Sequence, residues 1–304
     1  MTVTITGGTG LIGHALKQLL LQRGHKVFIL TREKKSNEEN VEYLKWDVTK
    51  QEIDKRAITE TDHIIHLAGA GIADKRWTKK RKNEIMESRT KSGEFLVNLL
   101  KTIPNDVKTI VSASAIGWYG EDPVIPNPHP FNETDPAANN FLGNTCQAWE
   151  ASIEPVTALG KRLVIFRTGI VLSKDGGALK EFMKPVRFGI AAILGSGKQM
   201  ISWIHIHDIC RLYVEALENH QINGVYNAVA SSPVSNKELV IQLATRKRGR
   251  FYIPMYVPSF ALRAVIGELS VEVLKSATVS NVKLRRTNFQ FAFPTIQSAM
   301  EELI

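Results

Sequence analysis

The sequence predicts a doubly wound α/β fold, in which helices cover both faces of a parallel sheet, followed by a small, mainly helical C-terminal lobe. Two observations predict the sheet. Strand-like and helix-like runs alternate through the first two-thirds of the chain, and a glycine-rich turn joins the first strand to the first helix. A third observation predicts the lobe, because the alternation stops after Arg250.

Six short apolar runs have the length and composition of strands that are buried on both faces of a sheet. They are TVTIT (2–6), KVFIL (26–30), VEYLKW (41–46), HIIHLAG (63–69), KTIVSAS (108–114) and RLVIFRTG (162–169). Apolar residues with helical spacing lie between them, for example at 12–20 and 95–100. Later, SNKE (235–238) has the form of a capping box and predicts a helix that runs to about Arg246.

Two segments interrupt this pattern. EDPVIPNPHPFNETDPAANN (121–140) is a long loop rich in proline and asparagine, and loops of this length inside a compact domain are usually functional or mobile. WIHIHD (203–208) predicts a strand. Its two histidines lack a third ligand at suitable spacing, so we expect no metal site there.

Composition limits the classes of protein to consider. The 304 residues carry a net charge of +9, and no apolar run approaches the roughly 20 residues of a membrane-spanning helix. The chain starts without a secretory signal, and Cys146 and Cys210 lack metal or disulfide spacing, so we expect a cytoplasmic protein without a membrane partner. Basic clusters at 75–82 and 246–250 are interpreted as solvated surfaces. RNA binding is retained only as a weaker alternative.

Gly7, Gly10 and Gly13 form a GxxGxxG between the first strand and the first helix. Glycines permit a tight turn there, and they let a pyrophosphate approach the backbone N–H groups at the helix N-terminus. Leu11 and Ile12 begin that helix, so their N–H groups join the predicted site. Strand, loop and helix occur in the required order, which predicts dinucleotide binding.

The end of the second strand predicts which dinucleotide binds. An NAD-selective protein usually places an acidic residue there, whereas this chain has Thr31 and Arg32. A guanidinium suits the 2′-phosphate of NADP, so we predict NADP as the cofactor. Asp47, at the end of the third strand, either accepts a hydrogen bond from the adenine amine or caps the following turn.

At this point the chain resembles the extended short-chain dehydrogenase/reductase superfamily, and within it the atypical, epimerase-like relatives of the nucleoside-diphosphate-sugar epimerases. The resemblance covers nearly the whole chain. The segments that carry it are GGTGLIG (7–13), LTR (30–32), HLAG (66–69), SASAIGWYG (112–120), CQAWE (146–150), RTGIVL (167–172), SWIHIHD (202–208), GVYNAVA (224–230) and FQFAFPT (289–295).

The resemblance implies an organisation and a set of cofactor contacts. It implies an NAD(P)-binding Rossmann domain over residues 1–237 and a small C-terminal domain over 248–297, with the second lobe drawn from parts after about residue 170. Leu67, Ala68 and Gly69 would line the pyrophosphate and ribose. Glu84, Arg89 and Arg167 would also contact the cofactor, although from the residues alone Glu84 and Arg89 would be solvated charges.

The catalytic residues of this superfamily are only partly present. Working members use a serine, a tyrosine and a lysine. The tyrosine transfers a proton, and the lysine lowers the pKa of the tyrosine and holds the nicotinamide ribose. Ser114 matches the serine. The expected Tyr-x-x-x-Lys is replaced by Cys146 and Glu150, and a carboxylate one turn away raises a thiol pKa rather than lowering it. Tyr119 and Cys146 are the remaining candidate proton donors, besides water. Glu150 is expected either to bind ribose hydroxyls or to support its helix.

We therefore expect an oxidoreductase or epimerase that acts on a small sugar-like or carbonyl substrate without the usual tyrosine–lysine pair. The competing hypothesis is a non-catalytic NADP(H) sensor or scaffold protein. The residues leave the oligomeric state open; a homodimer is one candidate, since long helices of this fold often pair, but no pairing face is identified.

Overall fold

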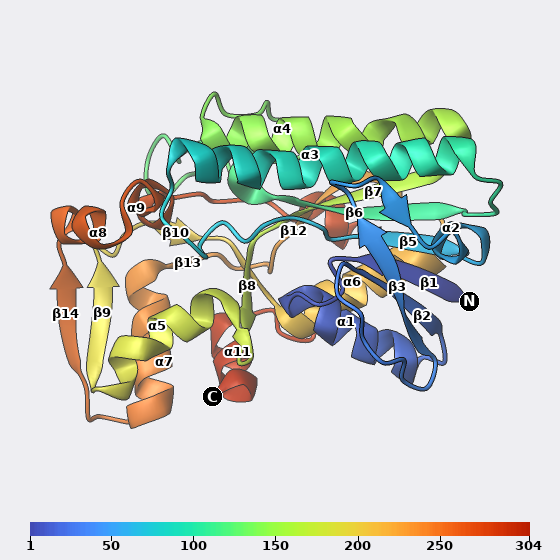
Figure 1. Cartoon of the computed structure of the whole chain (residues 1–304). Helices are drawn as coiled ribbons and strands as arrows, with labels where there is room; N and C mark the ends of the chain where they lie inside the picture. Colours follow the sequence, from blue (N-terminus) through green and yellow to red (C-terminus); the bar gives the residue numbers. More distant parts are fainter.

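A computed structural model describes all residues, 1–304, and is built around one eight-stranded sheet with the order β12-β7-β6-β5-β1-β2-β3-β4 (Figure 1). Every neighbouring pair is parallel except β3 and β4. The strands are β1 (Thr2–Thr6), β2 (Lys26–Thr31), β3 (Val41–Asp47), β4 (Glu52–Ile53), β5 (His63–His66), β6 (Thr109–Ala115), β7 (Arg162–Thr168) and β12 (Gly224–Ala228). This confirms the predicted doubly wound fold.

Helices cover both faces of the sheet, as Figure 1 shows. The helices α1 (Leu11–Gln22) and α6 (Ile206–Glu218) lie on one face, and α3 (Lys79–Thr102) and α4 (Phe141–Ile153) lie on the other. Successive side chains of β1 point to opposite faces of the sheet. Val3 and Ile5 point to one face and belong to the core under α1 and α6. The other face has its own core, which includes Phe95 of α3. Shorter helices α2 (Arg56–Thr59), η1 (Ile116–Trp118) and η2 (Glu154–Leu159) complete this part.

The strand order reverses at β1. Its neighbour on one side is β2, which follows it in the chain, and its neighbour on the other side is β5, which is reached by a later crossover. Ligands of open α/β sheets bind in the crevice that such a reversal leaves beyond the carboxyl ends of the strands. The glycine-rich segment 7–13 lies at this point.

A second lobe has a separate core, formed by residues from Leu172 to Leu303. Three two-stranded sheets, β11-β8, β14-β9 and β10-β13, contribute to it together with several helices. Its elements are β8 (Ile170–Ser173), α5 (Gly177–Arg187), β9 (Ile190–Leu194), β10 (Met200–Ile201), β11 (Trp203–His205), β13 (Val234–Ser235), α7 (Asn236–Arg248), β14 (Ile253–Val257), α8 (Ser259–Ile266), α9 (Leu269–Leu274), α10 (Val282–Arg285) and α11 (Ile296–Leu303). The chain between β11 and β13 returns to the large sheet as α6 and β12.

The structure differs from the sequence-based expectation in two places. The segment 203–208 is not one strand, because β11 ends at His205 and α6 begins at Ile206. The His205 side chain accepts the backbone N–H of His207 at 3.1 Å and so caps the helix in place of a continued strand. The C-terminal region is mainly helical, as predicted, but residues 253–257 form β14 and pair in parallel with β9.

None of the helices is both long enough and apolar enough to cross a lipid bilayer.

Candidate functional site

The loop after β1 is pressed against the end of β5. Gly7 has a φ of +68°, and a Cβ atom on it would lie 2.8 Å from the carbonyl carbon of Leu67. At Gly13 a Cβ atom would lie 2.5 Å from the Cα of Gly8. No side chain fits at either position, so these two glycines allow the tight turn that brings the loop to the strand reversal.

The N-terminus of α1 is open to an anion. Gly10 is its N-cap, and no side chain satisfies the first N–H groups of the helix. Gly10 is exposed, and Leu11 and Ile12 are half-buried. Unpaired N–H groups and the helix dipole together favour a phosphate at this position.

Thr6 fixes the wall of the crevice opposite this loop. Its hydroxyl accepts the backbone N–H groups of Leu67 at 3.1 Å and Ala68 at 3.2 Å. The same hydroxyl bonds to Nδ1 of the buried His66 at 2.8 Å. Burial lowers the pKa of His66 to about 4, so this imidazole is neutral near pH 7.

The predicted selectivity residues lie at the ends of β2 and β3. Arg32 is exposed and makes no ion pair, whereas the Thr31 hydroxyl accepts the N–H of Glu33 at 3.1 Å. Oδ1 of Asp47 accepts the N–H groups of Thr49 and Lys50, at 3.0 and 3.2 Å. Of the two roles expected for Asp47, capping of the turn is therefore present, and contact with adenine stays a prediction.

Arg89 lies beside Gly69 without a carboxylate partner. Its Nη1 donates to the carbonyl oxygens of Ala70 at 3.0 Å and Ile85 at 2.8 Å. Its guanidinium carbon is 4.9 Å from the centre of the Trp149 ring, and burial lowers its pKa. Such a cation is placed to attract an anionic ligand.

Glu84 is arranged differently. Its side chain is exposed and pairs with Arg81 at 2.8 Å, so in this structure it behaves as a surface charge. Its contact with a cofactor stays a prediction.

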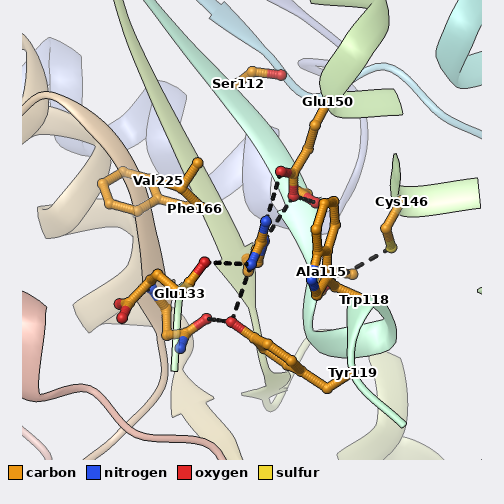
Figure 2. Close-up of polar contacts among 12 residues, drawn as sticks. Ser112, Ala115, Trp118, Tyr119, Glu133, Cys146, Glu150, Phe166 and Val225 are labelled. Atoms are coloured by element: carbon orange, nitrogen blue, oxygen red, sulfur yellow. Dashed lines mark hydrogen bonds and ion pairs between the residues drawn. The ribbon is translucent and has the colours of Figure 1, made fainter. Parts of the chain in front are cut away.

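The polar groups at the ends of β6 and β7 satisfy one another (Figure 2). Oε1 of Glu150 accepts the hydroxyl of Ser114 at 2.6 Å and Nε of Arg167 at 2.9 Å, and Oε2 accepts Nη2 of Arg167 at 2.9 Å. All three residues are buried. Burial opposes the charge on Arg167, but its hydrogen bonds with Glu150 outweigh this and raise its pKa.

Tyr119 belongs to the same network. Its hydroxyl donates to Oδ1 of Asn227 at 2.7 Å and accepts Nη1 of Arg167 at 3.2 Å, while its ring stacks on Phe131. The residue is completely buried, and burial raises its pKa to about 12. Proton donation by Tyr119 stays a prediction, and this geometry argues against it because both partners of the hydroxyl are protein groups.

Cys146 occupies the position of the superfamily's tyrosine. It is 3% exposed, and its thiol donates to the carbonyl oxygen of Ala115 at 3.6 Å. Burial, and secondarily the charge of Glu150, raises its pKa to about 11. The predicted direction of the shift is confirmed, and the group is a thiol near pH 7.

The sequence did not indicate how Arg167 and Glu150 relate. Arg167 was expected at the cofactor, and Glu150 was expected to bind ribose or to support its helix. The structure joins the two residues as an ion pair between β7 and α4, and stacks the guanidinium 3.5 Å from the Trp118 ring centre. One feature of the sequence could have indicated this pair. A glutamate in place of the lysine is buried in this fold, and a buried carboxylate requires a cation nearby.

The fold and this crevice define a dinucleotide-binding protein of the extended short-chain dehydrogenase/reductase type. The comparisons with known proteins narrow the class. The model of the NAD dependent epimerase/dehydratase family matches residues 3–228, and the chain belongs to that family. A model described as a domain of unknown function matches residues 257–303.

Relatives match along the whole chain. Epimerase family protein SSP1921 of Staphylococcus saprophyticus is 34% identical over 99% of this chain and 98% of its own length. The chloroplastic epimerase family protein SDR39U1 homolog of Arabidopsis thaliana is 32% identical, over 100% of this chain and 87% of its own. Human epimerase family protein SDR39U1, solved with NADPH, superimposes with a TM-score of 0.87 at 28% identity, over 100% of this chain and 99% of that one.

Proposed function

We propose that this protein is an NADP-dependent oxidoreductase or epimerase acting on a small substrate that carries a hydroxyl or carbonyl group. The observation that carries the proposal is the open anion site between Gly7 and Gly13, next to an exposed, unpaired Arg32 at the end of β2. The human relative that was solved with NADPH supports the choice of nucleotide.

The residues of this chain divide the work as follows. The loop 7–13 binds the pyrophosphate, and Arg32 pairs with the 2′-phosphate. Arg89, a cation without a carboxylate partner, adds attraction on the opposite wall of the crevice. The bound cofactor supplies or accepts the hydride.

Ser114 orients the substrate oxygen in this proposal. Its hydroxyl donates to Glu150, which leaves its lone pairs to accept a hydrogen bond from a substrate hydroxyl. Oxidation of that hydroxyl releases a proton, which passes through Ser114 to the Glu150 carboxylate as the hydride leaves the carbon. This step removes hydrogen from a hydroxyl, which begins both oxidation and epimerisation. The ion pair with Arg167 holds the Glu150 carboxylate beside Ser114.

A second function is favoured by the closed network around Glu150. A site whose polar groups bind one another can hold NADP(H) without reacting it, as a sensor or scaffold would. The absence of the tyrosine–lysine pair removes a contribution of about 10²–10⁴-fold to the rate.

One experiment separates the two functions. NADPH oxidation and NADP⁺ reduction are followed across libraries of carbonyls and alcohols, for the wild type and for Ser114→Ala, Tyr119→Phe and Cys146→Ser. Turnover that Ser114→Ala abolishes while NADPH still binds establishes an enzyme. Tight NADPH binding without turnover on any compound establishes the sensor, and failure to bind either nucleotide overturns both.

A further inference from the structure

The second lobe ends in a tip formed by two neighbouring turns. One turn joins α5 to β9 and contains Arg187-Phe188-Gly189, and the other joins α7 to β14 and contains Gly249-Arg250-Phe251. The N–H of Ile253 donates to the carbonyl oxygen of Gly189 at 2.8 Å. Figure 1 shows the two turns together at the lower ends of β9 and β14, far from the N-terminus. Two Arg-Phe dipeptides therefore lie side by side.

The aromatic side chains of this tip are exposed to solvent. Phe188 is 83% exposed, Phe251 is 86% exposed, and Ile253, which follows on β14, is 71% exposed. Burial of a Phe or Ile side chain stabilises by about 1.5–3 kcal/mol, and here that gain is not realised within the chain. Contiguous exposed apolar side chains mark interaction surfaces.

The charge around the tip is mainly positive. Residues 182–190 and 246–253, which include both turns, contain six lysines and arginines and no aspartate or glutamate, and Glu181 just before them pairs with Lys184. The net charge of the whole chain is +9, so these two segments hold most of its excess positive charge. A partner for this surface is therefore anionic.

A basic cavity adjoins the same surface. It has a volume of about 170 Å³, and its lining includes Lys180, Arg187 and Lys247. None of these three side chains makes an ion pair within the chain. Arg187 connects the cavity to the tip, because Phe188 follows it directly.

We propose that the tip binds an anionic lipid surface, with Phe188 and Phe251 at the boundary of headgroups and acyl chains and the basic cavity at a headgroup phosphate. Exposed aromatic and aliphatic groups ringed by arginine and lysine are the combination that lies in a membrane interface. No spanning helix is required, so the absence of one does not bear on this attachment.

Two other partners fit the surface less well. A second copy of the chain docking through the same tip would bring like charges together. A nucleic acid would match the charge and stack on the phenylalanines, but it would leave the exposed aliphatic side chain of Ile253, next to the tip on β14, without a partner.

The test is cosedimentation with vesicles. Phosphatidylcholine vesicles are compared with vesicles containing about 30% phosphatidylglycerol, at physiological salt. We expect binding to the anionic vesicles that is at least about tenfold tighter than to the neutral ones and that weakens as salt is raised. The double variant Phe188→Ser/Phe251→Ser and the double variant Lys180→Glu/Lys247→Glu should each lose about tenfold or more of this affinity.

The control replaces exposed lysines of the large sheet domain by the same charge reversal, Lys55→Glu/Lys101→Glu, and it should bind vesicles about as the wild type does. NADPH affinity and thermal melting verify that each variant is folded. Equal binding to neutral and anionic vesicles, or unchanged binding by the tip variants, overturns the proposal. If the wild type binds single-stranded RNA but no vesicles, and the tip variants lose the RNA binding, the partner of the tip is a nucleic acid and the lipid proposal is overturned.

Discussion

The two halves of the crevice differ in what their polar groups do. On the side of β1 and α1, the first N–H groups of the helix have no side-chain partner, and Arg32 is unpaired. On the side of β6 and β7, Glu150, Ser114 and Arg167 bind one another. The first half is prepared for a ligand that comes from outside. The second half has satisfied its own charges, and the position of the missing lysine holds a carboxylate that pairs with Arg167 and joins α4 to β7.

The largest effect on stability is expected when the ion pair between Glu150 and Arg167, on the side of β6 and β7, is broken. Glu150→Ala leaves Arg167 buried without its carboxylate, and the free energy of unfolding should fall by about 3–5 kcal/mol. Urea denaturation measures the change. Glu87→Ala, which breaks an exposed pair with Lys91, is the matched control and should cost about 0.5 kcal/mol or less. Equal losses in the two variants would show that the network contributes no more than a surface pair.

The next largest effect is on the pH dependence of stability. On the side of β1 and α1, the hydroxyl of Thr6 bonds to the buried, neutral imidazole of His66. Its pKa is about 4 in the folded protein and near 6.5 in the unfolded chain, so the unfolded chain binds more protons between these values. Stability should therefore be unaffected above pH 6.5 and fall as pH drops toward 4, by about 3 kcal/mol at the lower limit.

Denaturation midpoints across this pH range measure the slope. His66→Gln should remove this part of it, and the same change at the exposed His14 should leave the slope unaltered. An unchanged slope in His66→Gln would contradict the assignment.

A smaller effect is expected on nucleotide selectivity, which we assign to Arg32 at the end of β2. NADPH should bind more tightly than NADH, and Arg32→Ala should remove most of that preference, a loss of about 1–3 kcal/mol for a charged hydrogen bond. Titration calorimetry with both nucleotides measures it, with Arg246→Ala as a control at a distant exposed arginine. Equal affinities in the unmodified protein would refute the prediction.

The smallest effect is expected at Tyr119. Tyr119→Phe removes the hydrogen bond to Asn227 and should lower the free energy of unfolding by about 1 kcal/mol. Any turnover should persist, because the hydroxyl faces only Asn227 and Arg167. Turnover reduced by two or more orders of magnitude in a stable variant would make Tyr119 the proton donor instead.

The large sheet was predictable because each of its strands is a local apolar run, and the glycine turn is a local motif. The features that the sequence did not predict depend on partners that are distant in the chain. The strand β14 contains Pro254, and its only neighbour, β9, lies some 60 residues earlier. The pairing of Glu150 with Arg167 depends on how α4 packs beside β6 and β7, which no local pattern shows. The interpretation of the basic cluster at 246–250 as a solvated surface stays a prediction, and no local pattern shows that the fold brings Phe188 beside Phe251.

The last helix, α11, completes the core of the second lobe, and Glu302 on it bonds the His205 cap at 3.0 Å. Because α6 and β12 lie between the parts of that lobe in the chain, the large sheet collects its final strand at residue 228, well before residues 296–303 have emerged from the ribosome. Domains generally fold as units during synthesis, beginning at the N-terminus. Every strand of the large sheet is therefore made before the second lobe can close, but the core under α1 and α6 is complete only once Leu284 and Phe289 have been added.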